Sequence, residues 1–206
     1  MDVDKLAVKL TGWIKEKVEG AGAKGAVFGM SGGIDSSVIA ALSIKAFPDS
    51  SLGLIMPCHS NDLDRQHAEL CAKTFNVPTR TIPLESIYDA FLKLLPDFKA
   101  DASLLRMAQA NLKARLRMVT LFYTANELNY LVIGSGNRSE LTVGYFTKFG
   151  DSGVDLLPIG NLVKKEVREL ARYLKVPQPI IDKPPTAGLW AGQTDEGEMG
   201  FTYEVL

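Results

Sequence analysis

The residues best suited to chemistry lie together in one short glycine- and serine-rich run. That run reads Gly29-Met30-Ser31-Gly32-Gly33-Ile34-Asp35-Ser36-Ser37. Apolar residues flank it at 26–28 and 38–42, so we expect a buried strand, a tight turn and a helix. Gly32 and Gly33 can adopt positive φ, and the free N–H groups at a helix start bind phosphate. An acid at Asp35 would repel a bare polyphosphate, which predicts a Mg²⁺ ion between the two.

The same run distinguishes two classes of nucleotide-binding loop. A Walker A loop requires a lysine, and this run has none. The stretch Ser31-Gly32-Gly33-Ile34-Asp35-Ser36 instead resembles the signature of the pyrophosphate-loop ATPases, which cleave ATP between its α- and β-phosphates. Members of that class transfer AMP to a substrate oxygen and release pyrophosphate. The alternative is an ordinary glycine turn before a helix, because the helix dipole also favours an acid in the first turn.

Further acids and cations lie where other predicted elements begin or end. The run 135–140 follows the apolar run 130–134 and supplies Glu140, which could complete the Mg²⁺ shell begun by Asp35. Lys164 and Lys165 lie near the start of a predicted helix, where cations are unfavourable unless an anion or solvent is close. A second metal site could be assembled between residues 58 and 67, although a polar loop entering a helix explains the same residues: Cys58, His59, Asp62, Asp64 and His67.

A long predicted helix, 103–127, carries two groups of polar side chains. Asn111, Arg115 and Met118 fall at i, i+4 and i+7, so they share one face. Lys113 and Arg117 are like charges at i and i+4, which indicates either a solvated basic face or a nearby anion.

The elements that must position these residues alternate between strand and helix. We expect strands at 26–28, 52–57, 79–83 and 130–134, and helices at 4–19, 34–47, 63–75, 87–95, 103–127 and within 158–175. Alternation of this kind predicts an α/β fold, a Rossmann-like doubly wound parallel sheet with helices on both faces. Ligands of such sheets bind beyond the carboxyl ends of the strands, where the glycine run lies. Met56 and Pro57, at the end of the second strand, are expected to form a wall for adenine.

Length and composition favour one domain spanning residues 1–206 and exclude several classes of partner. The 23 basic and 24 acidic residues nearly cancel, which argues against a nucleic-acid or membrane surface. The 2 cysteines lack C-x-x-C spacing, so a disulfide framework is not expected. The first residues lack the basic region of a signal peptide, and no apolar run would span a bilayer. We therefore expect a cytoplasmic protein.

Five motifs, taken together, resemble those of the ammonia-dependent NAD synthetases, over a stretch that runs from about residue 29 to the end. The first is the glycine run, which many pyrophosphate-loop enzymes share, whereas the other four are specific in this order. They are Asn-Leu-Lys-Ala-Arg-Leu-Arg-Met (111–118), Gly-Ser-Gly-Asn-Arg-Ser-Glu (134–140), Tyr-Phe-Thr-Lys-Phe-Gly-Asp (145–151) and Lys-Pro-Pro-Thr-Ala-Gly-Leu-Trp-Ala-Gly-Gln-Thr-Asp-Glu (183–196). The resemblance implies ATP-dependent amidation of deamido-NAD by ammonia through an acyl-adenylate, giving NAD, AMP and pyrophosphate.

The resemblance also implies a role for individual residues. ATP is expected at Gly29–Ser36, and the catalytic group is expected to include Asp35, Glu140 and Lys164, with Asp151 orienting or deprotonating ammonia. The remaining implied contacts are Mg²⁺ with Asp35 and Glu140, ATP with Ser135, Lys164 and Thr186, and deamido-NAD with Arg115, Lys148 and Asp155.

Two departures from the family pattern affect these expectations. Family members commonly continue beyond Leu206 with a segment that contributes a basic contact to the dinucleotide, and no glutaminase region is present, which points to free ammonia. The family usually forms homodimers with the dinucleotide near the interface. The competing hypotheses are a tRNA-modifying ligase with the same loop, which should be more basic or richer in cysteine, and a non-catalytic nucleotide-binding module, which would not need two acids at separate strand ends.

Overall fold

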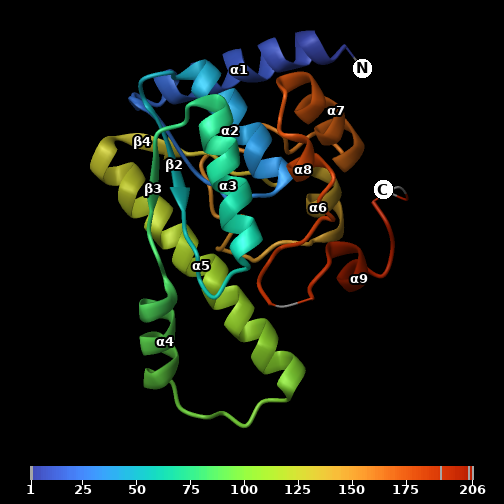
Figure 1. Ribbon diagram of the computed structural model, residues 1–206. Helices are drawn as coiled ribbons and strands as arrows, with labels where there is room; N and C mark the ends of the chain where they lie inside the picture. The colour runs from blue at the N-terminus through green and yellow to red at the C-terminus, as the bar shows by residue number, and fades with distance from the viewer. Residues whose placement is uncertain (1, 191, 204, 206) are drawn as a thin grey trace.

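Short apolar segments pair as parallel strands at the centre of the molecule (Figure 1). The strands β1 (Gly25–Gly29), β2 (Ser51–Ile55), β3 (Thr79–Thr81) and β4 (Tyr130–Val132) form a 4-stranded sheet in the order β3-β2-β1-β4. Val27 of β1 pairs with Leu52 of β2 on one side and with Val132 of β4 on the other. The structure, a computed structural model, describes residues 2–190, 192–203 and 205.

One face of the sheet is covered by helices from both ends of the chain. These are α1 (Val3–Gly20), α2 (Ile34–Ala46), α3 (Asp62–Phe75) and α7 (Lys164–Leu174), of which α2 packs against α1, α3 and α7. Ala26 and Phe28 of β1 point into this layer and are fully buried, as are Ile14 of α1 and Leu170 of α7. Because alternate strand residues face opposite sides, Val27 points the other way.

The other face is covered by α5 (Ala102–Leu128), and α4 (Glu85–Leu94) packs against α5. Val27, Leu54 and Val132 of the sheet pack there against Leu121 and Ala125 of α5 in a second apolar cluster. The first half of α5 extends past the sheet and projects with α4 from the body of the molecule (Figure 1). The predicted α/β fold with helices on both faces is therefore confirmed.

The order of the strands fixes where a ligand can bind. The chain runs from β1 to β2 and β3 in one direction, and then returns through α4 and α5 to place β4 on the other side of β1. Between β1 and β4 the connections diverge to opposite faces, which opens a crevice at the carboxyl ends of these strands. The glycine- and serine-rich run leaves β1 at this point.

The observed elements agree with the expected ones, except for three short helices that the sequence analysis missed. These are α6 (Arg138–Val143), α8 (Gln178–Ile181) and α9 (Asp195–Met199). Glu140 thus lies on α6, and the last of the five motifs ends in α9. Ala191, which belongs to the last of the five motifs, lies outside the described residues, as do Glu204 and Leu206. Where the chain is described, no helix has both the length and the apolar character needed to cross a bilayer.

Candidate active site

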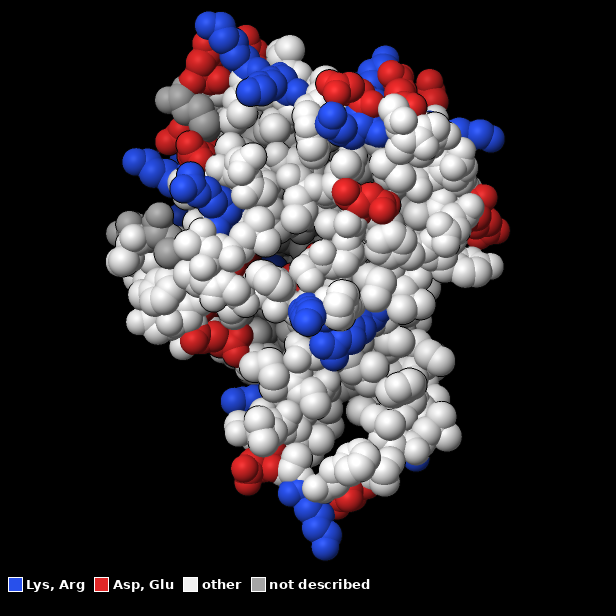
Figure 2. Space-filling view, turned by 180° about the vertical axis from the view of Figure 1, so that it is seen from behind, with Lys and Arg blue, Asp and Glu red and all other residues white. Residues whose placement is uncertain are grey.

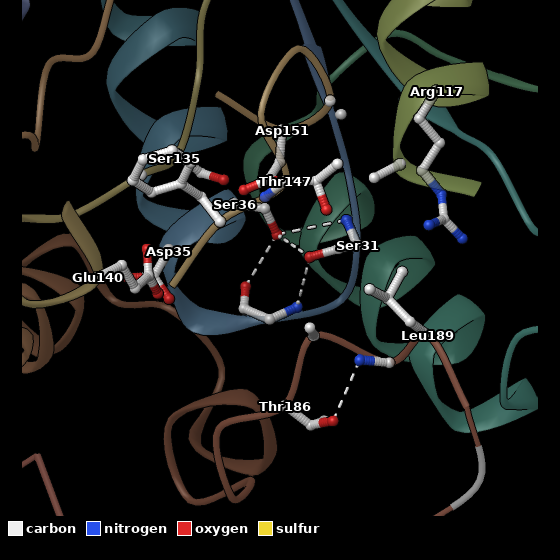
Figure 3. A pocket seen from close by; sticks show the side chains of 18 of the residues that line it. Ser31, Asp35, Ser36, Arg117, Ser135, Glu140, Thr147, Asp151, Thr186 and Leu189 are labelled. Carbon is white, nitrogen blue, oxygen red and sulfur yellow. Dashed lines mark hydrogen bonds between the residues drawn. The ribbon is translucent and has the colours of Figure 1, made fainter. Parts of the chain in front are cut away.

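A large pocket opens at the carboxyl ends of the strands, at the crevice between β1 and β4. Its cavity volume is about 650 Å³, and its walls come from the segments that follow β1, β2 and β4, from one side of α5 and from residues 183–198. The pocket therefore brings together regions more than 150 residues apart in the sequence. Each of the five motifs of the sequence analysis contributes residues to it, and so do the four residues expected to be catalytic (Figure 3).

Hydroxyl groups hold the glycine- and serine-rich run in a tight turn at the base of the pocket. The Ser31 and Ser36 hydroxyls lie 3.0 Å apart, and the Gly33 N–H donates to Ser31 Oγ at 3.3 Å. The Ser36 hydroxyl also donates to the Gly33 carbonyl at 3.0 Å, as Figure 3 shows. Gly33 is the N-cap of α2 and has no side chain to occupy the first N–H groups, so they remain available to an anion.

The two central glycines have different roles. Gly32 has φ of +76°, and a Cβ on it would lie 2.1 Å from the Asp64 carbonyl oxygen of α3. Gly33 has φ of −91°, so the expectation of positive φ at this second glycine was wrong. Gly32 is required for the turn and for its contact with α3, whereas Gly33 lines the pocket.

Lys164 lies at the centre of the charged groups in the pocket. It begins α7 and is only 2% exposed, and its Nζ lies 2.5 Å from Asp35 Oδ2 and 3.6 Å from Glu140 Oε1. The nearby anion that the position of this lysine indicated is therefore present as two carboxylates. Asn137 holds both of them, because its Nδ2 donates to Asp35 Oδ1 at 3.0 Å and its backbone N–H donates to Glu140 Oε2 at 3.1 Å.

Two carboxylates and one ammonium group leave this cluster with an excess of negative charge. Burial, and next to it the neighbouring Asp35 carboxylate, raise the pKa of Glu140 to about 8, although Lys164 acts in the opposite direction. Burial acts to lower the pKa of Lys164, but Asp35 and Glu140 outweigh it, so this pKa lies above its usual value. At neutral pH without a metal, the cluster therefore retains a proton on Glu140 and a charged lysine.

The chemistry of the cluster fits a magnesium ion. Asp35 and Glu140 provide hard oxygen ligands, and the Lys164 ammonium shows that a cation is stable between them. The part of the chain that the structure describes has no group of three or more His, Cys, Asp or Glu side chains that could hold a metal. A site with two carboxylates suits Mg²⁺, which usually takes its other ligands from water and substrate phosphates. The alternative metal site at residues 58–67 is not formed among the described residues.

The opposite wall of the pocket is built around Asp151. The Asp151 Oδ1 accepts the Thr147 N–H at 2.8 Å, and the Thr147 hydroxyl lies 2.8 Å from Asn111 Oδ1 on α5. Burial raises the pKa of Asp151, while the hydrogen bonds from Thr147 act in the opposite direction. A carboxyl group with a raised pKa that is open to a pocket is suited to accepting a proton.

Of the three residues expected to contact deamido-NAD, two line the pocket. Arg115 on α5 donates from Nε and from a terminal nitrogen to the Lys148 carbonyl, at 3.3 and 3.2 Å, and both side chains lie at the pocket. Asp155 does not line it. Its Oδ2 instead accepts the Val132 N–H at 2.8 Å, so this carboxylate caps the end of β4.

The second pair of cations on α5 is bound to protein and not solvated: Lys113 is buried and Arg117 is half-buried. Lys113 donates to the Leu189 carbonyl at 2.9 Å, and Arg117 donates to the Met56 carbonyl at 3.1 Å and to the Ser60 hydroxyl at 3.2 Å. Arg117 thereby fixes the end of β2, where Met56 lines the pocket as expected. The basic-face alternative for these two residues was wrong, because both side chains are bound to protein oxygen atoms.

Residues 183–198 form the remaining wall, and several contacts hold them against the body of the protein. Lys183 forms an ion pair with Asp64 of α3. The Thr186 hydroxyl donates to the Gln193 carbonyl at 2.8 Å, and the Leu189 N–H donates to Gln193 Oε1 at 2.7 Å. Thr186 and Leu189 face the glycine run across the pocket (Figure 3). Ser135, which follows β4, lines the same pocket.

Some site residues were not identified from the sequence. Asn137 stands three positions before Glu140, and together they form a capping box at the start of α6, a pattern that the spacing could have revealed. Asp195 belongs to the fifth motif but was given no role, and it lines the pocket and is bound by Tyr203, which no sequence pattern marks. Both depend on how the chain after residue 183 folds back.

A parallel sheet with a glycine turn at its switch point, beside a lysine and two carboxylates, is typical of the nucleotide-binding α/β proteins. Comparison with known proteins defines the group more closely. The NAD synthase family matches residues 6–206, and the chain belongs to that family. The resemblance noted in the sequence is thus confirmed, and the competing classes, a tRNA-modifying ligase and a non-catalytic module, find no support.

Individual relatives agree with this assignment. An NH(3)-dependent NAD(+) synthetase of Carboxydothermus hydrogenoformans is 55% identical over 198 residues, which cover 96% of this chain and 81% of the relative. A solved NMN synthetase from Francisella tularensis superposes with a TM-score of 0.93 at 41% identity, covering 99% of this chain and 84% of that one. A solved NH3-dependent NAD synthetase from Campylobacter jejuni has a TM-score of 0.81 at 36% identity, covering 88% and 77%.

Proposed function

We propose that this chain catalyses the ATP-dependent amidation of deamido-NAD by ammonia, giving NAD, AMP and pyrophosphate. The observation that carries the proposal is the cluster of Lys164, Asp35 and Glu140 beside the glycine turn, facing Arg115 and Asp151 across one pocket. Such an arrangement supplies positive charge for a triphosphate on one side and positioning groups for an acceptor on the other. The names of the relatives support the same reaction.

In the first step, a nicotinate carboxylate oxygen of deamido-NAD attacks the α-phosphorus of ATP. The bond from that phosphorus to the bridging oxygen breaks, pyrophosphate leaves, and an acyl-adenylate remains. Two anions must approach each other, so catalysis depends on neutralising charge and on holding the reactants in line. Lys164 and the N–H groups at the start of α2 provide the neutralising charge from within the pocket.

Asp35 and Glu140 would hold the Mg²⁺ ion of this reaction, with Ser31, Gly33 and Ser36 binding phosphate oxygens. When bound, the ion supplies two positive charges, which offset the negative charges of the phosphates and of the two carboxylates. Lys164 forms ion pairs with both carboxylates, so its ammonium group lies beside the glycine turn, where it can contact a phosphate of ATP.

In the second step, ammonia attacks the acyl carbon and AMP leaves with the carboxylate oxygen that joined it to the nicotinoyl group. The attacking nitrogen must lose a proton. Asp151 lies at the acceptor wall with a raised pKa, so it is placed to orient ammonia or to accept that proton. Arg115 and Lys148 bind phosphate oxygens of deamido-NAD and so hold its nicotinate ring toward ATP.

Ammonia is proposed as the nitrogen source because neither cysteine is suited to hydrolysing glutamine. Cys58 and Cys71 are both buried, and burial raises the pKa of each thiol. A nucleophilic thiol instead requires a lowered pKa and an accessible site. His67, one turn from Cys71 on α3, is itself buried, and burial lowers its pKa.

Exchange of labelled pyrophosphate into ATP tests the first step. The purified protein should catalyse exchange only when deamido-NAD and Mg²⁺ are both present, because the acceptor carboxylate must attack before pyrophosphate is released. Glu140→Gln should lose exchange, whereas the control Glu69→Gln, an exposed residue of α3, should keep it. Exchange without any acceptor, or none under any condition, would contradict the proposal.

A second candidate acceptor is nicotinate mononucleotide, which would give NMN. The high similarity to the Francisella tularensis NMN synthetase favours testing it. The two acceptors share the nicotinate carboxylate, so the chemistry at Lys164 is unchanged. Comparing kcat/KM for the two acceptors decides between them. If the value is higher for nicotinate mononucleotide, that mononucleotide replaces deamido-NAD as the proposed substrate.

We also propose that the chain forms a homodimer through α4, the loop after it and the first half of α5. Large apolar side chains are exposed there, among them Leu94 at 82%, Phe98 at 80% and Leu104 at 62%. The projecting part of the molecule carries few charges in Figure 2 apart from its tip. Contiguous exposed apolar surface of this kind usually marks an interface. Light scattering should give twice the chain mass of 22.4 kDa, and Phe98→Asp should reduce it to that of one chain.

A further inference from the structure

The ammonium group of Lys164 has an aromatic neighbour. Its Nζ lies 4.9 Å from the centre of the Tyr203 ring, and both side chains are buried. The negative face of an aromatic ring attracts a cation, most strongly where water is excluded. Tyr203 follows α9, so this contact joins the final part of the described chain to the charged cluster at the start of α7.

Hydrogen bonds hold the ring in this position. The Tyr203 hydroxyl donates to Asp195 Oδ2 at 2.9 Å, and the Tyr203 N–H donates to Glu196 Oε1 at 2.9 Å. Asp195, only 4% exposed, is attached to the pocket wall because its N–H donates to the Pro185 carbonyl at 3.2 Å. The ring is therefore connected to the same segment that carries Thr186.

An aromatic face suits Lys164 better than a further carboxylate would. The ammonium group already contacts Asp35 and Glu140, and a third acid in contact with it would compete with ATP for the same positive charge. A ring orients the ammonium group without adding a net charge. Lys164 can then leave the carboxylates and contact a phosphate while it keeps one fixed neighbour.

We infer that Tyr203, held in place by Asp195, is a positioning residue that directs the Lys164 ammonium group at the phosphates of ATP. This inference rests on the proposed function, since it concerns the step in which AMP is transferred. It makes the segment after Lys183 part of the triphosphate site as well as a wall of the pocket. It also predicts that the ring face matters more than the bulk of the side chain.

Two substitutions separate the ring face from simple packing. Tyr203→Leu keeps a large apolar side chain but has no ring, whereas Tyr203→Phe keeps the ring and loses the bond to Asp195. We expect Tyr203→Leu to lower the rate constant of ATP–pyrophosphate exchange about tenfold, and Tyr203→Phe to lower it about two- to threefold. The KM for deamido-NAD should change less than twofold in both. Tyr173→Leu, at the exposed far end of α7, is the matched control and should match the wild type.

Nuclear magnetic resonance provides a readout that does not depend on activity. Protons over the face of an aromatic ring are shifted upfield, so the ε-methylene protons of Lys164 should resonate upfield of other lysines in the wild type. The shift should persist in Tyr203→Phe and disappear in Tyr203→Leu, with both variants showing a cooperative thermal unfolding transition.

Equal exchange rates in the two Tyr203 variants would overturn the inference. So would the absence of an upfield Lys164 signal in the wild type, a result that needs no variant to fold. If the wild type catalyses no exchange with either acceptor, the proposed function fails instead, and the spectroscopic test of the Lys164–Tyr203 contact still stands by itself.

Discussion

The raised pKa of Glu140 makes the stability of the metal-free protein depend on pH. This carboxyl group has a pKa of about 8 in the folded protein, against 4.5 for an ordinary glutamate. Between those two pH values the folded state binds a proton that the unfolded state has lost. Raising the pH through this interval therefore destabilises the fold, and Glu140→Gln, which cannot ionise, should be free of the effect.

The size of the effect follows from the same two values. Each pH unit in which the two states differ by one proton changes the free energy of unfolding by about 1.4 kcal/mol. Over the interval from 4.5 to about 8, the upper limit is about 5 kcal/mol, which solvent access to the pocket reduces. The penalty is absent below pH 4.5 and fully developed above pH 8. Mg²⁺ should reduce it, because the ion binds the ionised form.

Urea unfolding between pH 5 and 8.5 in the presence of a chelator measures this dependence. The difference in unfolding free energy between Glu140→Gln and the wild type should grow over this range by roughly 2–4 kcal/mol. The control is Glu69→Gln, an exposed glutamate for which the difference should be flat. If the difference for Glu140→Gln does not change with pH, the pKa of Glu140 is not raised in the folded protein and this account is wrong.

Three further predictions concern catalysis. Asp35→Asn should keep the fold but lower turnover roughly 10²–10³-fold, because it removes one Mg²⁺ ligand. Near-normal turnover of this variant at ordinary Mg²⁺ concentration would contradict a metal site formed by Asp35 and Glu140. Arg115→Ala should raise the KM for deamido-NAD about tenfold and that for ATP much less, as steady-state kinetics can measure, and equal losses would make this arginine structural. At a fixed ammonium concentration the rate should rise as pH approaches the ammonium pKa, since only neutral ammonia attacks. If glutamine supports equal turnover and Cys71→Ala loses only the glutamine-dependent activity, ammonia is not the direct nitrogen source.

The sequence predicted the sheet and the loop because both depend on local patterns. Short apolar runs bounded by glycine and polar residues identify β1 and β2, and the serine–glycine run between β1 and α2 is a local motif. The length of α5 could likewise be predicted from the sequence, and helical spacing showed which residues share a face with Arg115. Such features require no knowledge of distant contacts.

The details that sequence analysis missed depend on contacts between distant segments. Lys164 and Asp35 are 129 residues apart, so an anion near the lysine could be expected but not this ion pair. Asp155 carries the same charge as a ligand-binding acid, yet its bond to the Val132 N–H follows only from the position of β4. Tyr203 gains its place near Lys164 only when the chain folds back after residue 183.

One measurement tests the central claim most directly: the fate of the oxygen atoms of the acceptor carboxylate. Deamido-NAD labelled with ¹⁸O in its nicotinate carboxylate should be converted with unlabelled ATP and ammonium, and AMP analysed by mass spectrometry. If the carboxylate attacks the α-phosphorus in the pocket formed by Lys164, Asp35 and Glu140, each AMP carries one ¹⁸O and pyrophosphate carries none. AMP free of ¹⁸O, or label in pyrophosphate, would contradict the account.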